Sequence, residues 1–322
     1  MKGLGLIITV LFSFFLVENG HCQVNWHTPQ EWIDNTDKSK PVYAFIWSEK
    51  DAFGKIFEQN TLGNQQVVEY LNTHYYAVKF LAEDTTTYSS DGYAYKDHKQ
   101  LYGRTINALA YEMSNGLSAL PTHFFQTANS RNSGLDRGNK SPEEFLLALE
   151  YYNGNSDKMS FAEFTLRKDL ASKLARILNE YSNHFEPFKG KEQESTLTKL
   201  VVNYESTIQL PQTDLNKVTK TYMDDGKTEH KMSCRLANNI TIDSANALLL
   251  LWRERIESCQ IQSIVSSASY TVTDLYDDDN DPFREMHFIY LDTKPVFADL
   301  KISIKFQPVF GSENVSMFLT IK

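Results

Sequence analysis

The sequence predicts an α/β domain, then a helical connector, then an α+β domain with an antiparallel sheet. Three observations lead to this prediction. Apolar runs of strand length alternate with helical patterns over residues 24–164. A polar stretch broken by Pro187 and Gly190 follows. Beyond residue 258, short alternating runs are separated by turn residues. We therefore expect domains at 23–164 and 196–322, with a helical connector and linker at 165–195.

Composition narrows the classes of function. The chain has 322 residues, of which 41% are hydrophobic and 13% aromatic, so two packed domains are expected. Its formal net charge of −9 repels polyanions on average, and nucleic acid is not an expected partner. The sequence has no phosphate loop, no nucleophile elbow and no zinc-binding helix motif. No cofactor and no metal are expected.

Residues 1–22 are predicted to be a signal peptide. A positively charged start precedes the apolar run 4–17, and cleavage after Cys22 would leave Gln23 as the N-terminus. The alternative is a lipoprotein anchored at Cys22, but Asn19-Gly20-His21 is not the small or apolar approach that lipidation requires. We therefore expect an exported protein, periplasmic or secreted. No later segment is long and apolar enough for a transmembrane span.

The elements of the first domain follow in order. The unbroken apolar run 41–47 predicts a strand that is covered on both faces. Ser141, Pro142 and Glu144 together predict the start of a helix. The remaining elements are a short helix after Thr28, a helix from Lys55 with a further turn at 67–71, a strand at 75–84, a helix at 106–113 and a strand at 120–127.

The second half has a different pattern. Helices are expected at 161–185 and 244–258, and strands at 269–276, 285–291, 299–310 and 314–322. An acidic run between two of these strands raises a calcium alternative, with Asp277, Asp279 and Asp281 as ligands. Because the run lacks the glycine of a calcium loop and has Phe288 at the twelfth position, a solvated turn is favoured.

Four segments of the first domain carry a resemblance to a known family. They are "KPV" at 40–42, "VVEYLNTHYYAVKFLAED" at 67–84, "INALAYEMSNGLSALPTHFF" at 106–125 and "SPEEFLLALEYYNGNSDKMSFAEF" at 141–164. In type, order and spacing they resemble secreted thioredoxin-like proteins of Bacteroidetes-type bacteria. The resemblance implies a thioredoxin-like α/β sandwich for this domain.

Active members of that family carry a Trp-Cys-x-x-Cys-Lys motif between the first two segments. An alignment without gaps puts Asp51 and Gly54 at the two cysteines and Lys55 at the lysine. Disulfide exchange needs a thiolate, which neither Asp51 nor Gly54 can supply, so thiol-disulfide oxidoreductase activity is not expected here. The degenerate motif reads Lys50, Asp51, Ala52, Phe53 and Gly54.

A proline loop is the second feature that the resemblance implies. In the family the proline opposite the motif is cis, and its loop presents backbone groups to an extended peptide segment. At the matching positions this chain has Leu120, Pro121 and Thr122, which we name as a peptide-binding loop. The alternative is that the proline is kept only because the fold needs it. His123 follows this loop and either borders it or has a structural role.

Two cysteines remain after cleavage, Cys234 and Cys259. An even number in an oxidising compartment predicts a disulfide between them, and two separately buried thiols are the alternative.

Three hypotheses of function follow. The first is a redox-inactive envelope protein that acts as a protein-binding or adaptor module, with an unidentified envelope or secreted protein as its partner. The second is an enzyme with its active site in the C-terminal domain. The third is a thiol-disulfide protein that uses Cys234 and Cys259.

Overall fold

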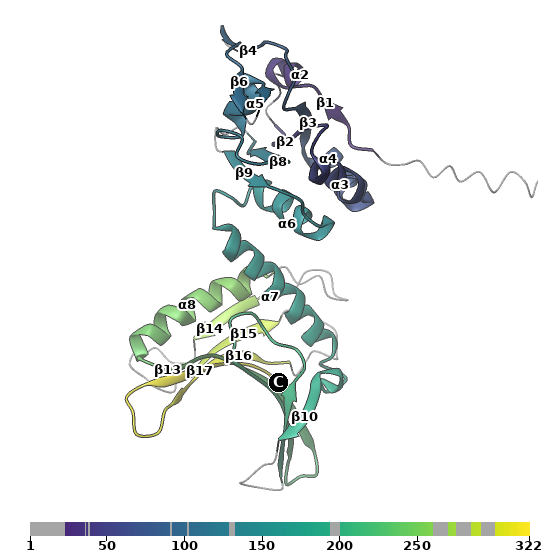
Figure 1. Cartoon of the computed structure of the whole chain (residues 1–322). Helices are drawn as coiled ribbons and strands as arrows, with labels where there is room; N and C mark the ends of the chain where they lie inside the picture. The colour runs from purple at the N-terminus through teal and green to yellow at the C-terminus, as the bar shows by residue number, and fades with distance from the viewer. Residues whose placement is uncertain are drawn as a thin grey trace, which may run out of the picture. The chain divides into compact units, whose positions relative to one another are not determined.

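The computed structural model describes residues 23–35, 37, 39–90, 92–101, 103–128, 133–193, 200–259, 270–274, 285–290 and 300–322. The predicted signal peptide with Cys22, and the acidic residues Asp277, Asp279 and Asp281, lie outside the described residues. The chain divides between Phe161 and Ala162 into two compact units, called unit 1 and unit 2 below. In Figure 1, unit 1 runs from purple to teal and unit 2 from teal to yellow.

Unit 1 is built on a five-stranded mixed sheet with the order β1-β3-β2-β8-β9 (Figure 1). β1, β3 and β2 are parallel, whereas β8 is antiparallel to β2 and β9 is antiparallel to β8. The predicted mixed α/β character of this domain is confirmed. The strands are β1 (Trp26–His27), β2 (Val42–Trp47), β3 (Tyr76–Leu81), β8 (Thr122–Gln126) and β9 (Ser133–Arg137).

Helices cover both faces of this sheet. Tyr43 and Phe45 of β2 belong to one buried cluster, while Val42, Ala44 and Ile46 belong to another. Strand β2 is therefore buried on both faces, as its apolar run predicts. The first cluster includes α3 (Ala52–Asn60), α4 (Gln65–His74) and α6 (Pro142–Tyr152), and the second includes α2 (Pro29–Asp34) and α5 (Ala108–Met113).

The predicted start signals of two helices are confirmed. At α6, the Ser141 hydroxyl accepts a hydrogen bond from the Glu144 amide, and the Glu144 carboxylate accepts one from the Ser141 amide. Thr28 and Glu31 form the same reciprocal pair at α2. Each pair satisfies two backbone donors that a helix start would otherwise leave without a partner.

The helix predicted from Lys55 is in fact two helices, α3 and α4. Asn64 caps the second one, because its side-chain oxygen accepts hydrogen bonds from the amides of Gln66 and Val67. An Asn that binds the backbone in this way favours a new helix start over a continued helix.

The polar segment after β3 forms two short antiparallel hairpins, for which the sequence analysis makes no prediction. Gly92 and Gly103 lie in their turns with φ of +80° and +72°, a conformation that glycine adopts without steric cost. The hairpins pair β4 (Tyr88–Ser90) with β5 (Tyr93–Tyr95) and β6 (Lys99–Leu101) with β7 (Arg104–Ile106).

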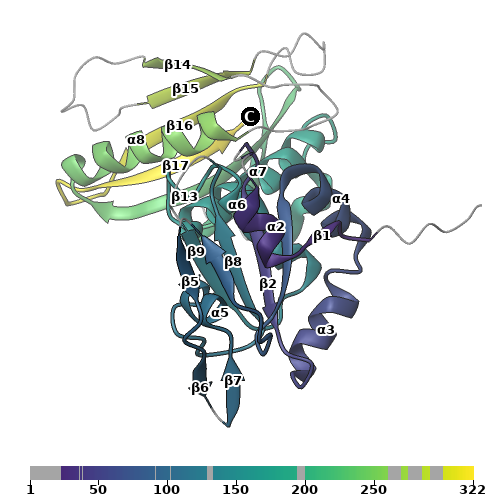
Figure 2. The ribbon, with the colours of Figure 1, turned by 90° about the horizontal axis from the view of Figure 1, so that it is seen from above.

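Unit 2 is built on an eight-stranded antiparallel sheet with the order β10-β11-β12-β13-β17-β16-β15-β14. Figure 2 shows α8 lying along its central strands. The strands are β10 (Lys189–Gln193), β11 (Val201–Ser206), β12 (Leu215–Tyr222), β13 (Thr228–Ile240), β14 (Tyr270–Asp274), β15 (Glu285–Tyr290), β16 (Ile302–Pro308) and β17 (Val315–Ile321).

The predicted helix at 244–258 and the four predicted C-terminal strands are present, as α8 (Ile242–Ser258) and β14 to β17. The region 165–195 differs from the prediction of a connector and linker. Helix α7 (Phe161–Asn179) packs into the core of unit 2 through Leu170 and Leu174. The stretch after Pro187 forms the edge strand β10. Its polar side chains suit an edge strand that is open to water on one side.

The two faces of this sheet carry different side chains. On β13, Met232 and Cys234 belong to the core cluster that also contains α7 and α8. Their neighbours Lys231 and Ser233 line a hollow on the other face. Because side chains alternate along a strand, the helices cover one face and the second face stays polar.

The predicted disulfide is absent from the structure. Cys234 and Cys259 are both free thiols, and both are buried. Cys234 lies in the middle of β13, whereas Cys259 follows α8 and donates a hydrogen bond from Sγ to the Arg255 carbonyl at 3.1 Å. Burial raises the pKa of each thiol to about 12. The alternative of two separate buried thiols is the one that the structure contains.

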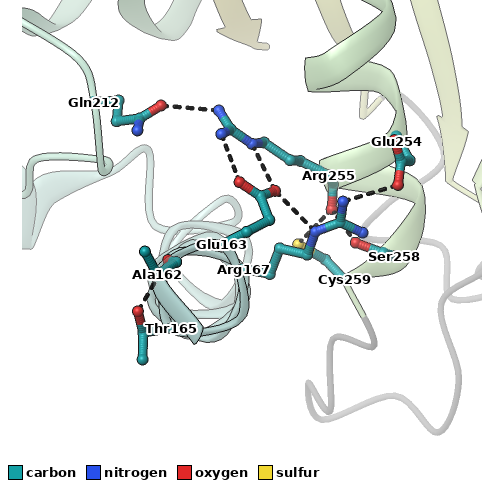
Figure 3. A network of polar contacts seen from close by, with 9 residues as sticks. All are labelled: Ala162, Glu163, Thr165, Arg167, Gln212, Glu254, Arg255, Ser258 and Cys259. Carbon is teal, nitrogen blue, oxygen red and sulfur yellow. Dashed lines mark hydrogen bonds and ion pairs between the residues drawn. The ribbon is translucent and has the colours of Figure 1, made fainter. Parts of the chain in front are cut away.

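A charged network holds α7 to α8 within unit 2 (Figure 3). Arg255 is nearly fully buried, and its Nε and Nη2 donate to the two carboxylate oxygens of Glu163 at 3.0 and 2.8 Å. Its Nη1 donates to Gln212 at 2.9 Å, and Arg167 donates to the same Glu163 at 2.9 Å. The hydrogen bond from Arg255 is the main cause that lowers the pKa of Glu163.

We expect Glu163→Ala to lower the free energy of unfolding of unit 2 by about 3 kcal/mol, because it leaves the Arg255 guanidinium buried and unpaired. Hydrogen exchange of the α8 amides at increasing urea measures this free energy for unit 2.

The matched control is Glu257→Ala, which removes the exposed Arg253–Glu257 pair of the same helix. A loss of no more than about 0.5 kcal/mol is expected for it. Equal losses of unfolding free energy in both variants would show that the buried pair contributes no more to stability than the exposed pair.

Candidate functional site

The degenerate motif lies at the start of α3, where Asp51 is the N-cap. Asp51 Oδ1 accepts a hydrogen bond from the Phe53 amide at 3.1 Å, and Oδ2 accepts one from the Gly54 amide at 2.9 Å. These amides are donors that the helix itself cannot satisfy, and a negative charge is favourable at this end of the helix dipole. Asp51 thus stabilises the start of α3 both as a hydrogen-bond acceptor and through its charge.

The absence of a side chain at Gly54 leaves room for the Asp51 carboxylate. A Cβ atom on Gly54 would lie 3.0 Å from Asp51 Oδ2, which is tighter than an ordinary contact. A side chain at position 54 would therefore compete with the hydrogen bonds that Asp51 makes to the helix. No cysteine occurs between Gln23 and Phe161, so unit 1 has no thiol outside the predicted signal peptide.

The loop before β8 has the geometry that the resemblance implies. The Leu120–Pro121 peptide bond is cis. Thr122 Oγ1 donates to the Ala119 carbonyl at 2.6 Å, and the Gly138 amide donates to the Pro121 carbonyl at 2.9 Å, so both ends of the loop are anchored. Within the described part of the chain, no hydrogen bond uses the amide or the carbonyl of Leu120. These two backbone groups are therefore available as a donor and an acceptor for a further hydrogen bond.

The motif and this loop line one cleft of about 320 Å³. Lys50 and Asp51 form one part of its wall and the loop 117–120 another, while Leu101, Arg104 and Ile106 come from the β6–β7 hairpin. The fold thus brings together three of the predicted site residues, namely Lys50, Asp51 and Leu120. The other predicted residues, Ala52, Phe53, Gly54, Pro121 and Thr122, lie beside the cleft in sequence but do not line it.

Arg104 is positioned in this cleft by Glu83. Its Nη1 lies 3.4 Å from Glu83 Oε1 and 3.3 Å from Ser48 Oγ, and the Ser48 hydroxyl donates to the same Glu83 oxygen at 2.6 Å. Glu83 Oε2 is buried and has no hydrogen-bond partner among the described residues. Sequence analysis missed both Arg104 and Glu83. Arg104 lies in a polar segment without a motif, and Glu83 is one acidic residue at the end of a strand.

Phe53 and Ile56 of α3 are two exposed apolar residues that follow the cleft residues Lys50 and Asp51 in the chain. They are one helical turn apart on α3, and 61% and 40% of their surfaces are exposed. Phe57, four residues after Phe53, is by contrast fully buried. Exposed aromatic side chains are enriched on surfaces that contact another protein.

His123 does not border the cleft, because it is buried inside unit 1. Its Nδ1 accepts a hydrogen bond from the Tyr43 hydroxyl at 3.0 Å, and its Nε2 donates to the Gly138 carbonyl at 2.9 Å. Burial raises the pKa of Tyr43, which keeps this hydroxyl protonated. Burial also lowers the pKa of His123 to about 4. The structural role considered for His123 is the one that the geometry supports.

No group of three or more His, Cys, Asp or Glu side chains in the described ranges is placed to hold a metal ion. Each of the three guanidinium nitrogens of Arg255 donates a hydrogen bond within unit 2 (Figure 3). The helices with described coordinates include none that is long and apolar enough to cross a membrane.

Comparisons with known proteins add little to this geometry. No family model matches the chain, and no curated protein matches it. Among solved structures, the chain is similar to a thioredoxin-fold protein from Helicobacter pylori, with 11% identity and a TM-score of 0.32. The similarity covers 41% of this chain and 81% of that chain. It concerns the fold alone and carries no inference about function.

The burial of His123 predicts a pH dependence of stability. The pKa of His123 is about 4 in the folded protein and about 6.5 in the unfolded chain, so the unfolded chain binds the proton more tightly. The stability that depends on neutral His123 is complete above pH 6.5 and is lost progressively as pH falls toward 4. The difference amounts to on the order of 3 kcal/mol.

Urea unfolding of the protein at several pH values, followed by hydrogen exchange of the β8 amides, tests this expectation. In His123→Gln the fall of stability between pH 6.5 and 4 should be much smaller, whereas His74→Gln on the surface should keep the full fall. The same fall in both variants would contradict the assignment to His123.

Proposed function

We propose that unit 1 is a redox-inactive, thioredoxin-like module that binds an extended segment of another exported protein. The observation that carries this proposal is the cleft between the start of α3 and the loop 117–120, with the backbone of Leu120 open beside it. An extended segment that pairs with Leu120 would gain main-chain hydrogen bonds, and its alternate side chains would enter the cleft.

The lining of the cleft indicates which segment would fit. Leu101, Ile106 and Leu117 offer an apolar surface. Arg104 and Lys50 offer two positive charges against the one negative charge of Asp51. Since Arg104 is already oriented by Glu83, it presents a fixed donor to a carboxylate at small cost in conformational entropy. The favoured segment therefore has an apolar residue and an acidic residue on the same side of an extended chain.

The proposed lack of redox activity rests on the chemistry of the motif. The Asp51 carboxylate occupies the helix N-terminus, where a thiol would be activated, and it cannot form a mixed disulfide. The third hypothesis, exchange through Cys234 and Cys259, has little support. Both thiols are buried, they are not bonded to each other, and their raised pKa leaves almost no thiolate at neutral pH.

Export to the periplasm or beyond is part of the same proposal. It rests on the predicted signal peptide at 1–22, and the bound partner would then be an envelope or secreted protein. The second hypothesis, an enzyme site in the C-terminal domain, is supported by no arrangement of catalytic groups among the described residues of unit 2.

Peptides selected from a random display library against the mature chain 23–322 test the binding proposal. We expect selected peptides to combine an apolar and an acidic residue, and Arg104→Ala to weaken binding at least tenfold, about 1.4 kcal/mol. The double variant Asp51→Arg/Phe53→Ala should also weaken binding. Affinities are measured by fluorescence anisotropy.

Two controls sharpen this experiment. Glu69→Arg changes the charge on the exposed side of α4, away from the cleft, and should leave affinity unchanged. N-methylation of the peptide at the residue that faces Leu120 should abolish binding, because it removes the donor of a main-chain hydrogen bond. Peptides that bind equally well to all variants, or a library that yields no binder, would rule the proposal out.

Redox inactivity is tested by the reduction of insulin with dithiothreitol. The protein should not accelerate this reaction above the rate without protein, because no accessible thiolate is present. The variant Cys234→Ser/Cys259→Ser should behave in the same way. Acceleration by the native protein that disappears in this variant would restore the third hypothesis.

A further inference from the structure

The face of the unit 2 sheet that the helices leave uncovered has a hollow of about 550 Å³. Its lining includes five lysines and one glutamate. They are Lys217, Lys231, Lys301, Lys305, Lys322 and Glu229. They come from β12, β13 and the strands or strand ends of β16 and β17. Figure 1 shows these strands curving away from α7 and α8.

The charge of this hollow is opposite to that of the chain. The chain has a formal net charge of −9, yet the lining has a surplus of four positive charges, five lysines against one glutamate. Lys322 pairs with Glu229 at 2.8 Å. In the described residues, no ion pair involves Lys217, Lys231 or Lys301. A concave surface of one sign concentrates the electrostatic potential and attracts ions of the other sign.

The pairing of the strands places like charges side by side. Lys301 and Lys322 are opposite each other, with each amide donating to the other's carbonyl at 2.8 and 2.9 Å. Like charges in opposite positions of a sheet are destabilising. Lys231 is half-buried, and its pKa is lowered first by burial and then by the charge of Lys217. Glu229 offsets part of this repulsion through its ion pair with Lys322, and a bound anion would relieve more of it.

The rest of the lining suits a small ligand. A row of hydroxyl groups crosses the sheet next to the lysines, because Ser233 pairs with Thr320 and Thr320 pairs with Ser303. Leu215 and Phe318 add an apolar wall against which a carbon skeleton can lie. The volume falls within the range of small-molecule sites, roughly 300–1,000 Å³.

We propose that this hollow binds a small organic anion that carries two or more carboxylate or phosphate groups. The lysines bind the charged groups, the hydroxyl row donates hydrogen bonds, and Phe318 contacts the carbon skeleton. The positive charge is confined to the hollow of an otherwise acidic protein, which favours a compact ligand over an extended polyanion. This proposal is independent of the function proposed for unit 1.

Calorimetric titration of the mature chain 23–322 in 150 mM salt tests the proposal with three probes. Citrate represents carboxylates, fructose 1,6-bisphosphate represents phosphates, and glucose is the neutral control. We expect at least one of the two anions to bind with a dissociation constant below about 1 mM and glucose not to bind. Which anion binds more tightly identifies the ligand chemistry.

Single lysine substitutions test whether the anion binds in the hollow. Lys231→Met keeps the aliphatic chain and should weaken anion binding at least tenfold, and Lys301→Ala at the exposed rim should weaken it to a smaller extent. The matched control Lys227→Met removes one charge from an exposed turn outside the hollow and should bind as the native chain does. Circular dichroism of each variant shows whether it folds.

Three outcomes would overturn the proposal. The first is no binding of either anion at millimolar concentration by the folded native chain. The second is an equal effect of Lys231→Met and Lys227→Met, which would mean a general charge effect. The third is binding of anionic lipid vesicles or of polyglutamate that depends on Lys231 when neither small anion binds, which would make this face a docking surface for a macromolecule.

Discussion

The buried pair of Glu163 and Arg255 is the interaction on which the organisation of unit 2 depends. A guanidinium with almost no access to water must be neutralised where it lies, and Glu163 does this with two parallel hydrogen bonds. The pair ties α7 to α8 above the same face of the sheet. The lysine-lined hollow lies on the other face of the sheet.

Unit 1 places a carboxylate at the start of α3. The start of α3 is a place where backbone donors and the helix dipole favour a negative group. In a thiol enzyme this effect stabilises a thiolate, whereas here it stabilises the carboxylate of Asp51. Gly54 leaves the space that this cap needs. The binding proposed for unit 1 uses the cleft and the backbone of Leu120, and neither requires a thiol.

Sequence patterns predict best those elements whose signal lies within one short segment of the chain. The apolar run of β2 and the capping box of α6 are confirmed because each depends on residues close together in the chain. The prediction of a linker after Phe185 was wrong. A polar edge strand and a polar linker have the same amino-acid composition, so composition does not distinguish them. The prediction of a disulfide was wrong. An even number of cysteines gives no information on the distance between them, and Cys234 and Cys259 are two free thiols buried in the same core.

The sequence by itself determined the alternation of side chains along the strands, the start of each capped helix and the absence of a Cys-x-x-Cys motif. These are properties of neighbouring residues and of local backbone geometry. Only the tertiary structure decided that Arg104 meets Glu83 beside Asp51, and that lysines from separate strands share one hollow. Such sites combine residues that are distant in the chain, and their proximity follows from strand order and register, which no local pattern encodes.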